Sequence, residues 1–140
     1  MSLNLATAVY TRWNDTSLDT TVSTVYWGET APEGDDLPRA VYEIASDDNT
    51  GMSVGSLMHT VRLRFKTWDA SPELVSGYNR LIFNAFHNAH NAGTNPLTMS
   101  GGTVQHCLYQ SETTEEEDTE VYMGIVDFEV KYEEQNTTPS

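Results

Sequence analysis

Residues 59–68 alternate between apolar and polar side chains, and this pattern constrains the fold more than any other in the chain. Val61, Leu63 and Phe65 would face one side of a strand, whereas the basic side chains between them would face the other. A period of two is typical of a strand in a sheet with one face in the core and one in solvent. The chain must therefore form a sheet that is covered on one side.

A long amphipathic helix is predicted directly after this strand, over residues 72–90. Ser71 can cap its start, Pro72 suits the first helical position, and Glu73 lies near the positive end of the helix dipole. Its apolar residues recur at helical spacing: Leu74, Val75, Tyr78, Leu81, Ile82, Ala85, Phe86 and Ala89. Residues 3–14 show the same spacing and predict a second, shorter helix.

Further strands are predicted over residues 20–27, 40–46, 103–111 and 121–132, with a bulge near Gly124 in the last of them. Residues 29–38 should form a loop, residues 47–51 a turn, and residues 112–120 a solvated hairpin tip. We therefore expect one domain over residues 1–134 and a polar tail over residues 135–140. Its fold class is α+β: a two-layer sandwich with a mostly antiparallel sheet of about four to five strands and two helices packed on one face.

The chain is strongly acidic, with 21 Asp and Glu against 7 Lys and Arg and a formal net charge of -14. Phosphate backbones and anionic lipids bind through Lys and Arg, so this balance opposes binding to nucleic acid or to a membrane. Adaptation to a saline environment is an alternative explanation of the acidity. Neither a leader sequence nor an apolar run long enough to span a bilayer is present, which predicts a protein that stays soluble in a cytoplasm.

Candidate catalytic and metal-binding residues are few. His87 and His90 are three positions apart and could share a metal ion, but two ligands fall short of a closed zinc site. Cys107 stands alone in a strand-like pattern, which favours a buried structural thiol. The carboxylates from Glu115 to Asp118 lack the spacing and the glycine of a calcium loop. No nucleophile or phosphate-binding motif occurs, so we predict no catalytic, cofactor or metal site and no enzymatic activity.

A basic stripe is predicted on the solvent side of the strand over residues 59–68. It comprises His59, Arg62, Arg64 and Lys66. In so acidic a chain, this stripe could bind an acidic neighbour, including another copy of the same protein. Simple solvation of the four side chains is the alternative.

The order of segments resembles the tail-completion, or tail-terminator, proteins of long-tailed, siphovirus-like bacteriophages. The likeness is carried by the opening helix ending near Trp13, the loop sequences APEG at 31–34 and LPRAVYEI at 37–44, the strand at 59–68, the helix at 74–89, the turn sequence LTMSGG at 97–102 and the final strand. It covers roughly residues 3–132. Compared with the usual pattern, this chain has a longer and more acidic final hairpin and a polar C-terminal tail.

The resemblance implies a structural virion subunit that assembles as a ring, commonly a hexamer, at the head-proximal end of the tail tube. There it would end tube polymerisation and join the tail to the head, with the major tail tube protein and the head-tail connector protein as partners. The resemblance also implies that the protein uses no cofactor and that it assembles in the host cytoplasm. A head-tail connector, a neck or minor tail subunit, or a small ligand-binding module are the alternative functions.

A ring of this kind must let DNA pass without binding it, which suggests a role for the acidic loops. Carboxylates at the lumen would repel the duplex. The candidate lumen residues are Glu33, Asp35, Asp36, Glu115, Glu116, Glu117 and Asp118. The alternative is that these loops face outward and only keep the protein soluble.

Overall fold

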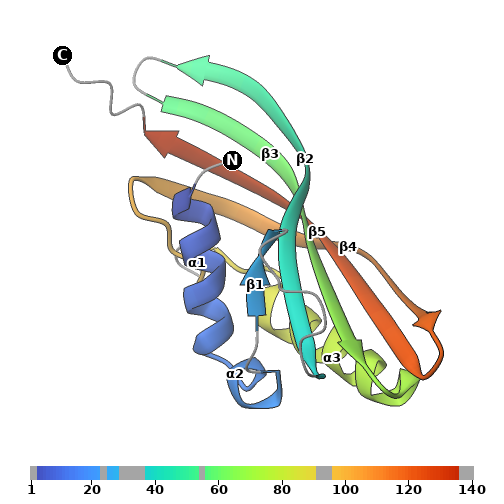
Figure 1. The fold of residues 1–140 in the computed structure, drawn as a ribbon. Coiled ribbons are helices and arrows are strands. Elements are labelled where there is room, and N and C mark those ends of the chain that lie inside the picture. The colour runs from blue at the N-terminus through green and yellow to red at the C-terminus, as the bar shows by residue number, and fades with distance from the viewer. Residues whose placement is uncertain (1–2, 23–24, 29–36, 54–55, 91–95, 136–140) are drawn as a thin grey trace.

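The computed structural model describes residues 3–22, 25–28, 37–53, 56–90 and 96–135 (Figure 1). Its elements are α1 (Leu3–Asn14), α2 (Leu18–Thr21), β1 (Val25–Trp27), β2 (Arg39–Ser53), β3 (Ser56–Asp69), α3 (Pro72–Phe86), β4 (Gly102–Asp118) and β5 (Val121–Gln135). The strands form one sheet in the order β1-β2-β3-β5-β4, in which only the β1–β2 pair is parallel. The predicted α+β sandwich is confirmed.

Helices α1 and α3 pack on the same face of the sheet, and the core lies between them and the long strands. Trp13 of α1 and Phe86 of α3 both contact the ring of Phe65 on β3, at centroid distances of 6.0 and 4.6 Å. The predicted bounds of the first helix are confirmed. Ser71 caps α3 as expected, because its Oγ atom accepts a hydrogen bond from the Leu74 amide at 3.4 Å. The sequence pattern therefore identified the two covering helices correctly.

Helix α3 ends at Phe86, four residues before the predicted end. His87 adopts an extended conformation and Asn88 has a positive φ of 60°. The Asn88 amide then donates a hydrogen bond to the Cys107 carbonyl on β4 at 2.8 Å. The chain leaves the helix early because its backbone pairs with the edge of the sheet instead.

Two predictions for the N-terminal half of the chain were wrong: the strand over residues 20–27 and the turn over residues 47–51. Residues 18–21 form the short helix α2, so among the described residues of the expected strand over residues 20–27 only Val25–Trp27 is extended. The indole of Trp13 holds this segment by donating a hydrogen bond to the Val22 carbonyl at 3.1 Å. Residues 47–51 do not form a turn but continue β2, with one register shift between Asn49 and Met52. The turn-prone residues 47–51 thus lie within a long strand that has an irregular register at this point.

The expected bulge at Gly124 was also wrong, because β5 keeps its register with β3 throughout and the irregularities lie in β2 and β4. Gly124 serves close packing instead. A Cβ atom there would lie 2.4 Å from Asn79 Oδ1 and 2.6 Å from Val75 Cγ1, both on α3. The glycine therefore lets the helix lie directly on the sheet.

The two long hairpins of the sheet end at opposite ends of the molecule (Figure 1). Strands β4 and β5 remain paired out to Asp118 and Val121, with Thr119 and Glu120 forming the turn. Residues 112–118 are therefore the end of a strand and not a loop, which corrects the prediction. No helix in the described part of the chain is long and apolar enough to cross a membrane.

Candidate assembly surfaces

The face of the sheet opposite α1 and α3 carries most of the positive charge of the protein. We call it the open face. Its basic residues are Arg39, Arg62, Arg64, Lys66 and Lys131, which are five of the seven Lys and Arg in the chain. Side chains alternate between the two faces along each strand, and residues paired across neighbouring strands point to the same face. In the pairing of β3 with β5, Arg62 lies opposite Glu129 and Arg64 lies opposite Asp127. Five of the seven cations of a protein with a net charge of -14 thus share one face, together with the carboxylates Glu43, Asp127 and Glu129.

Several of these cations already bind carboxylates of the same sheet. Arg64 donates two hydrogen bonds to Asp127, from Nε at 2.9 Å and from Nη2 at 3.1 Å. Lys66 Nζ lies 3.0 Å from Glu43 Oε1. The Asp127 side chain is only 5% exposed, so the bidentate pair satisfies a carboxylate that would otherwise be costly to bury. This pairing raises the pKa of the Arg64 guanidinium, mainly through the hydrogen bond to Asp127.

Arg62 and Lys131 form weaker or fewer ion pairs than Arg64 and Lys66 among the described residues. The Arg62 side chain is 49% exposed, and its contact with Asp127 is long at 3.5 Å. Lys131 has no ion pair within the part of the chain that the structure describes. The guanidinium of Arg39 lies over the Trp68 ring at 5.0 Å from its centroid. These three side chains leave positive charge available at the open face.

His59 does not belong to the basic stripe, and its predicted solvent-facing position was wrong. It has the parity of Val61, so it points to the covered face and is only 8% exposed. Its Nδ1 atom lies 3.2 Å from Asp47 Oδ1, and its ring stacks on Tyr132 at a centroid distance of 4.6 Å. The outward direction of Arg62, Arg64 and Lys66 is confirmed, whereas their role in an interface stays a prediction.

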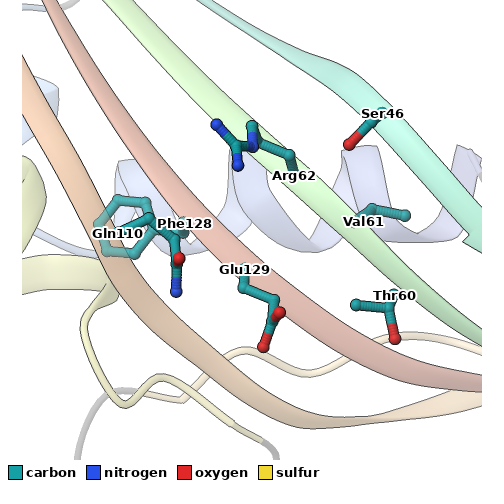
Figure 2. A pocket seen from close by; sticks show the side chains of 7 residues that line it. All are labelled: Ser46, Thr60, Val61, Arg62, Gln110, Phe128 and Glu129. Atoms are coloured by element: carbon teal, nitrogen blue, oxygen red, sulfur yellow. The ribbon is translucent and has the colours of Figure 1, made fainter.

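A shallow hollow of about 150 Å3 lies in the open face beside Arg62. It is lined by Ser46, Thr60, Val61, Arg62, Gln110, Phe128 and Glu129, which Figure 2 shows to come from four neighbouring strands. Register shifts flank it on both sides, between Ile44 and Ser46 in β2 and between Tyr109 and Ser111 in β4. Such bulges bend a strand and increase its twist, which fits a sheet that is hollowed at this line.

The far end of the β4–β5 hairpin forms a second charged surface, which we call the acidic end. Its six carboxylates are all exposed: Glu112, Glu115, Glu116, Glu117, Asp118 and Glu120. None of them forms an ion pair with a cation of the described residues. Glu116 hydrogen-bonds Tyr122 and thereby raises the pKa of the Tyr122 hydroxyl. Of the predicted acidic residues, Glu33, Asp35 and Asp36 lie outside the described residues.

The outer edge of β4 is protected in its middle by α3 and the residues after it. Besides the Asn88 bond to Cys107, the Tyr109 amide donates to His87 Nδ1 at 3.3 Å and the Asn79 side-chain amide donates to the Thr113 carbonyl at 3.2 Å. An unpaired strand edge invites pairing with another chain, and these contacts block it. His87 therefore accepts a hydrogen bond from the edge strand β4.

The described residues contain no group of three or more His, Cys, Asp or Glu side chains that could hold a metal ion. Cys107 is fully buried, as predicted, and burial raises the pKa of its thiol. Two other hollows, at the α1 surface next to residues 98–100 and between α1 and α3, contain no His, Cys, Asp or Glu among their lining residues. The charged features of the described structure are thus surfaces, not a convergent pocket.

Sequence reasoning missed Arg39, Asp127 and Lys131 as members of the open face. A signal was present in β5, where the apolar residues Val126, Phe128 and Val130 alternate with charged residues. That alternation repeats the pattern of β3, and two such neighbouring strands place both sets of charges on one face.

No protein-family model matches the chain, and no curated protein matches it. Among solved structures, a chain of the "Virion of native gene transfer agent (GTA) particle" is similar over 91% of this chain and 92% of its own length. The TM-score is 0.64 and the sequence identity is 15%. Over this range the protein therefore has a fold similar to that of a chain of the gene transfer agent particle.

Proposed function

We propose that this protein is a structural subunit of a phage-like virion and, within it, the tail terminator that forms a ring on the head-proximal end of the tail tube. The observation that carries this proposal is the similarity of fold, over 91% of this chain, with a chain of a gene transfer agent virion. The segments that resemble tail-terminator proteins span α1, β2, β3, α3 and β5, so the resemblance and the fold similarity concern the same elements.

The distribution of surfaces supports a role in assembly without catalysis. The helices cover one face of the sheet, the open face carries five of the seven basic residues, and the acidic end carries six exposed carboxylates. A subunit with two different charged surfaces suits head-to-tail contacts, which close into a ring when the rotation between subunits allows it. The acidic balance would let DNA pass through such a ring unbound. The proposed partners are other copies, the major tail tube protein and the head-tail connector protein.

Deleting the gene from its phage or particle should test the role directly. If the protein ends tube polymerisation, particles without it should carry overlong tails that are not joined to heads, and a plasmid copy should restore the normal length. Electron microscopy of tail lengths is the measurement. A gold-labelled antibody against the chain should mark the head-proximal end of complemented tails.

A connector or neck subunit is the second candidate, because the similar chain belongs to a whole particle and not to an isolated tail. The same deletion separates the two functions. Tails of normal length that fail to attach to heads would support a connector and contradict termination. Normal, infectious particles would contradict both.

A further inference from the structure

We propose that the acidic end of one copy docks on the open face of the next copy, at the hollow beside Arg62. The inference rests on the proposed ring, because it names the contact that would hold neighbouring subunits together. It assigns the acidic end a place at the subunit interface, in contrast to the prediction that Glu115 to Asp118 line the channel.

The carboxylates of the acidic end are exposed and are not paired with any cation of the described residues. Every residue from Gln110 to Glu120 is exposed, although β4 extends to Asp118. Six carboxylates within residues 112–120 repel one another. With no cation of the described residues paired to them, a basic surface on another molecule would relieve that repulsion.

The hollow offers groups that can bind a carboxylate, and its own carboxylate, Glu129, already lies 3.1 Å from His106 Nε2. Because Arg64 already satisfies Asp127 through two hydrogen bonds, the half-exposed Arg62 keeps donors for a second carboxylate. Lys131 lies next to it, opposite Thr60 in the register of β3 and β5. The hydroxyls of Ser46 and Thr60 and the amide of Gln110 line the same hollow (Figure 2) and can donate hydrogen bonds to carboxylate oxygens.

The contact must form between two copies. In β5, Glu129 at the hollow is eight positions from Val121 at the acidic end, which corresponds to about 27 Å along a strand. Five of its six carboxylates, from Glu115 to Glu120, lie opposite or beyond positions of β5 that are six or more residues from Glu129, so they cannot reach their own hollow. A contact between two different surfaces is heterologous, and repeated copies of it generate a closed ring or an open filament.

Charge reversal on each side tests the contact. The acidic-end variant is Glu115→Lys with Glu117→Lys, and the open-face variant is Arg62→Glu with Lys131→Glu. Each alone should raise the concentration for half-assembly by roughly tenfold or more, which is the scale of close interfacial charge pairs. Mixed in equal amounts, the two variants should assemble again, because each reversed acidic end then meets a reversed face and each native end meets a native face.

Asp15→Lys with Asp19→Lys is the matched control. Both residues are exposed and lie far along the chain from the hairpin, and the pair changes the net charge by the same amount as the acidic-end variant. The control should assemble at least as well as the unmodified protein, because it lowers the overall repulsion and leaves the contact intact. Equal loss of assembly in the control and the acidic-end variant would overturn the specific contact.

A disulfide trap checks the same contact without changing the basic residues. A chain with Glu116→Cys and Thr60→Cys should form a ladder of linked subunits on oxidation, whereas either substitution alone should not. The buried Cys107 does not compete. If the unmodified protein forms rings but neither charge reversal nor the trap affects or captures them, the docking contact is wrong and the acidic end is free to line the channel. If the unmodified protein never leaves the monomeric state, the ring itself is wrong and this contact falls with it.

Discussion

Replacing Gly124 by alanine should destabilise the fold, because α3 packs directly on this position of β5. The added Cβ atom would lie 2.4 Å from Asn79 Oδ1 and 2.6 Å from Val75 Cγ1, well inside van der Waals contact. Overpacking of a close interface costs about 1–3 kcal/mol. At roughly 3 °C per kcal/mol for a domain of this size, Tm should fall by about 3–9 °C.

Gly77→Ala provides a control with the same chemical change. Gly77 lies within α3 and is exposed, and a Cβ atom there would have open space around it to 4 Å. Alanine there should stabilise the helix by about 0.5–1 kcal/mol. Urea titration followed by circular dichroism measures both variants. A Gly124→Ala protein as stable as Gly77→Ala would refute the close approach of α3 to the sheet.

Three further predictions concern the core and its titratable groups. Phe86→Ala should cost about 3–5 kcal/mol in a urea titration, whereas Leu74→Ala, at a side chain 48% exposed, should stay within about 0.5 kcal/mol; equal losses would contradict the packing of α3. Cys107 should resist iodoacetamide at pH 8 in the native protein and react after denaturation, because burial raises its thiol pKa; rapid native labelling would contradict its burial. Burial raises the pKa of Tyr42 to about 12. As the pH rises, the unfolded state therefore loses the Tyr42 proton before the folded state does, and the stability of the fold should fall between about pH 10 and 12. Thermal melts of Tyr42→Phe over this pH range should show a smaller fall in Tm.

The elements dominated by local pattern could be predicted from the sequence. The alternation around Val61 to Phe65 identified β3, and the cap at Ser71 identified the start of α3, because a strand's period and a helix's cap depend on residues close together in the chain. The outward direction of Arg62 and Arg64 followed from the same alternation.

The misses arose where distant residues decide the structure. Glu115 to Asp118 have low strand propensity, yet pairing with β5 keeps them extended. Gly124 gave no local sign that a helix lies on it. The hollow depends on the register of four strands, including the pairing of Arg62 with Glu129, and periodicity within one strand does not predict that register.

Ionic strength should act on assembly in two opposite ways. At low salt the Debye length of about 30 Å lets the full charge of each copy repel the next. At about 0.15 M it shortens to about 8 Å, which screens the distant charges but spares close pairs between Arg62 or Lys131 and the acidic end. At about 1 M the close pairs weaken as well. We therefore expect assembly to be strongest at intermediate salt.

Light scattering across this salt series is the most direct test of the proposed ring. At about 0.15 M and high protein concentration, a closed hexamer of 15.6 kDa chains should give one species of about 94 kDa, and its share should fall at both lower and higher salt. A ring of another size would still support closed head-to-tail assembly. A species of 15.6 kDa at every salt and concentration would contradict the account.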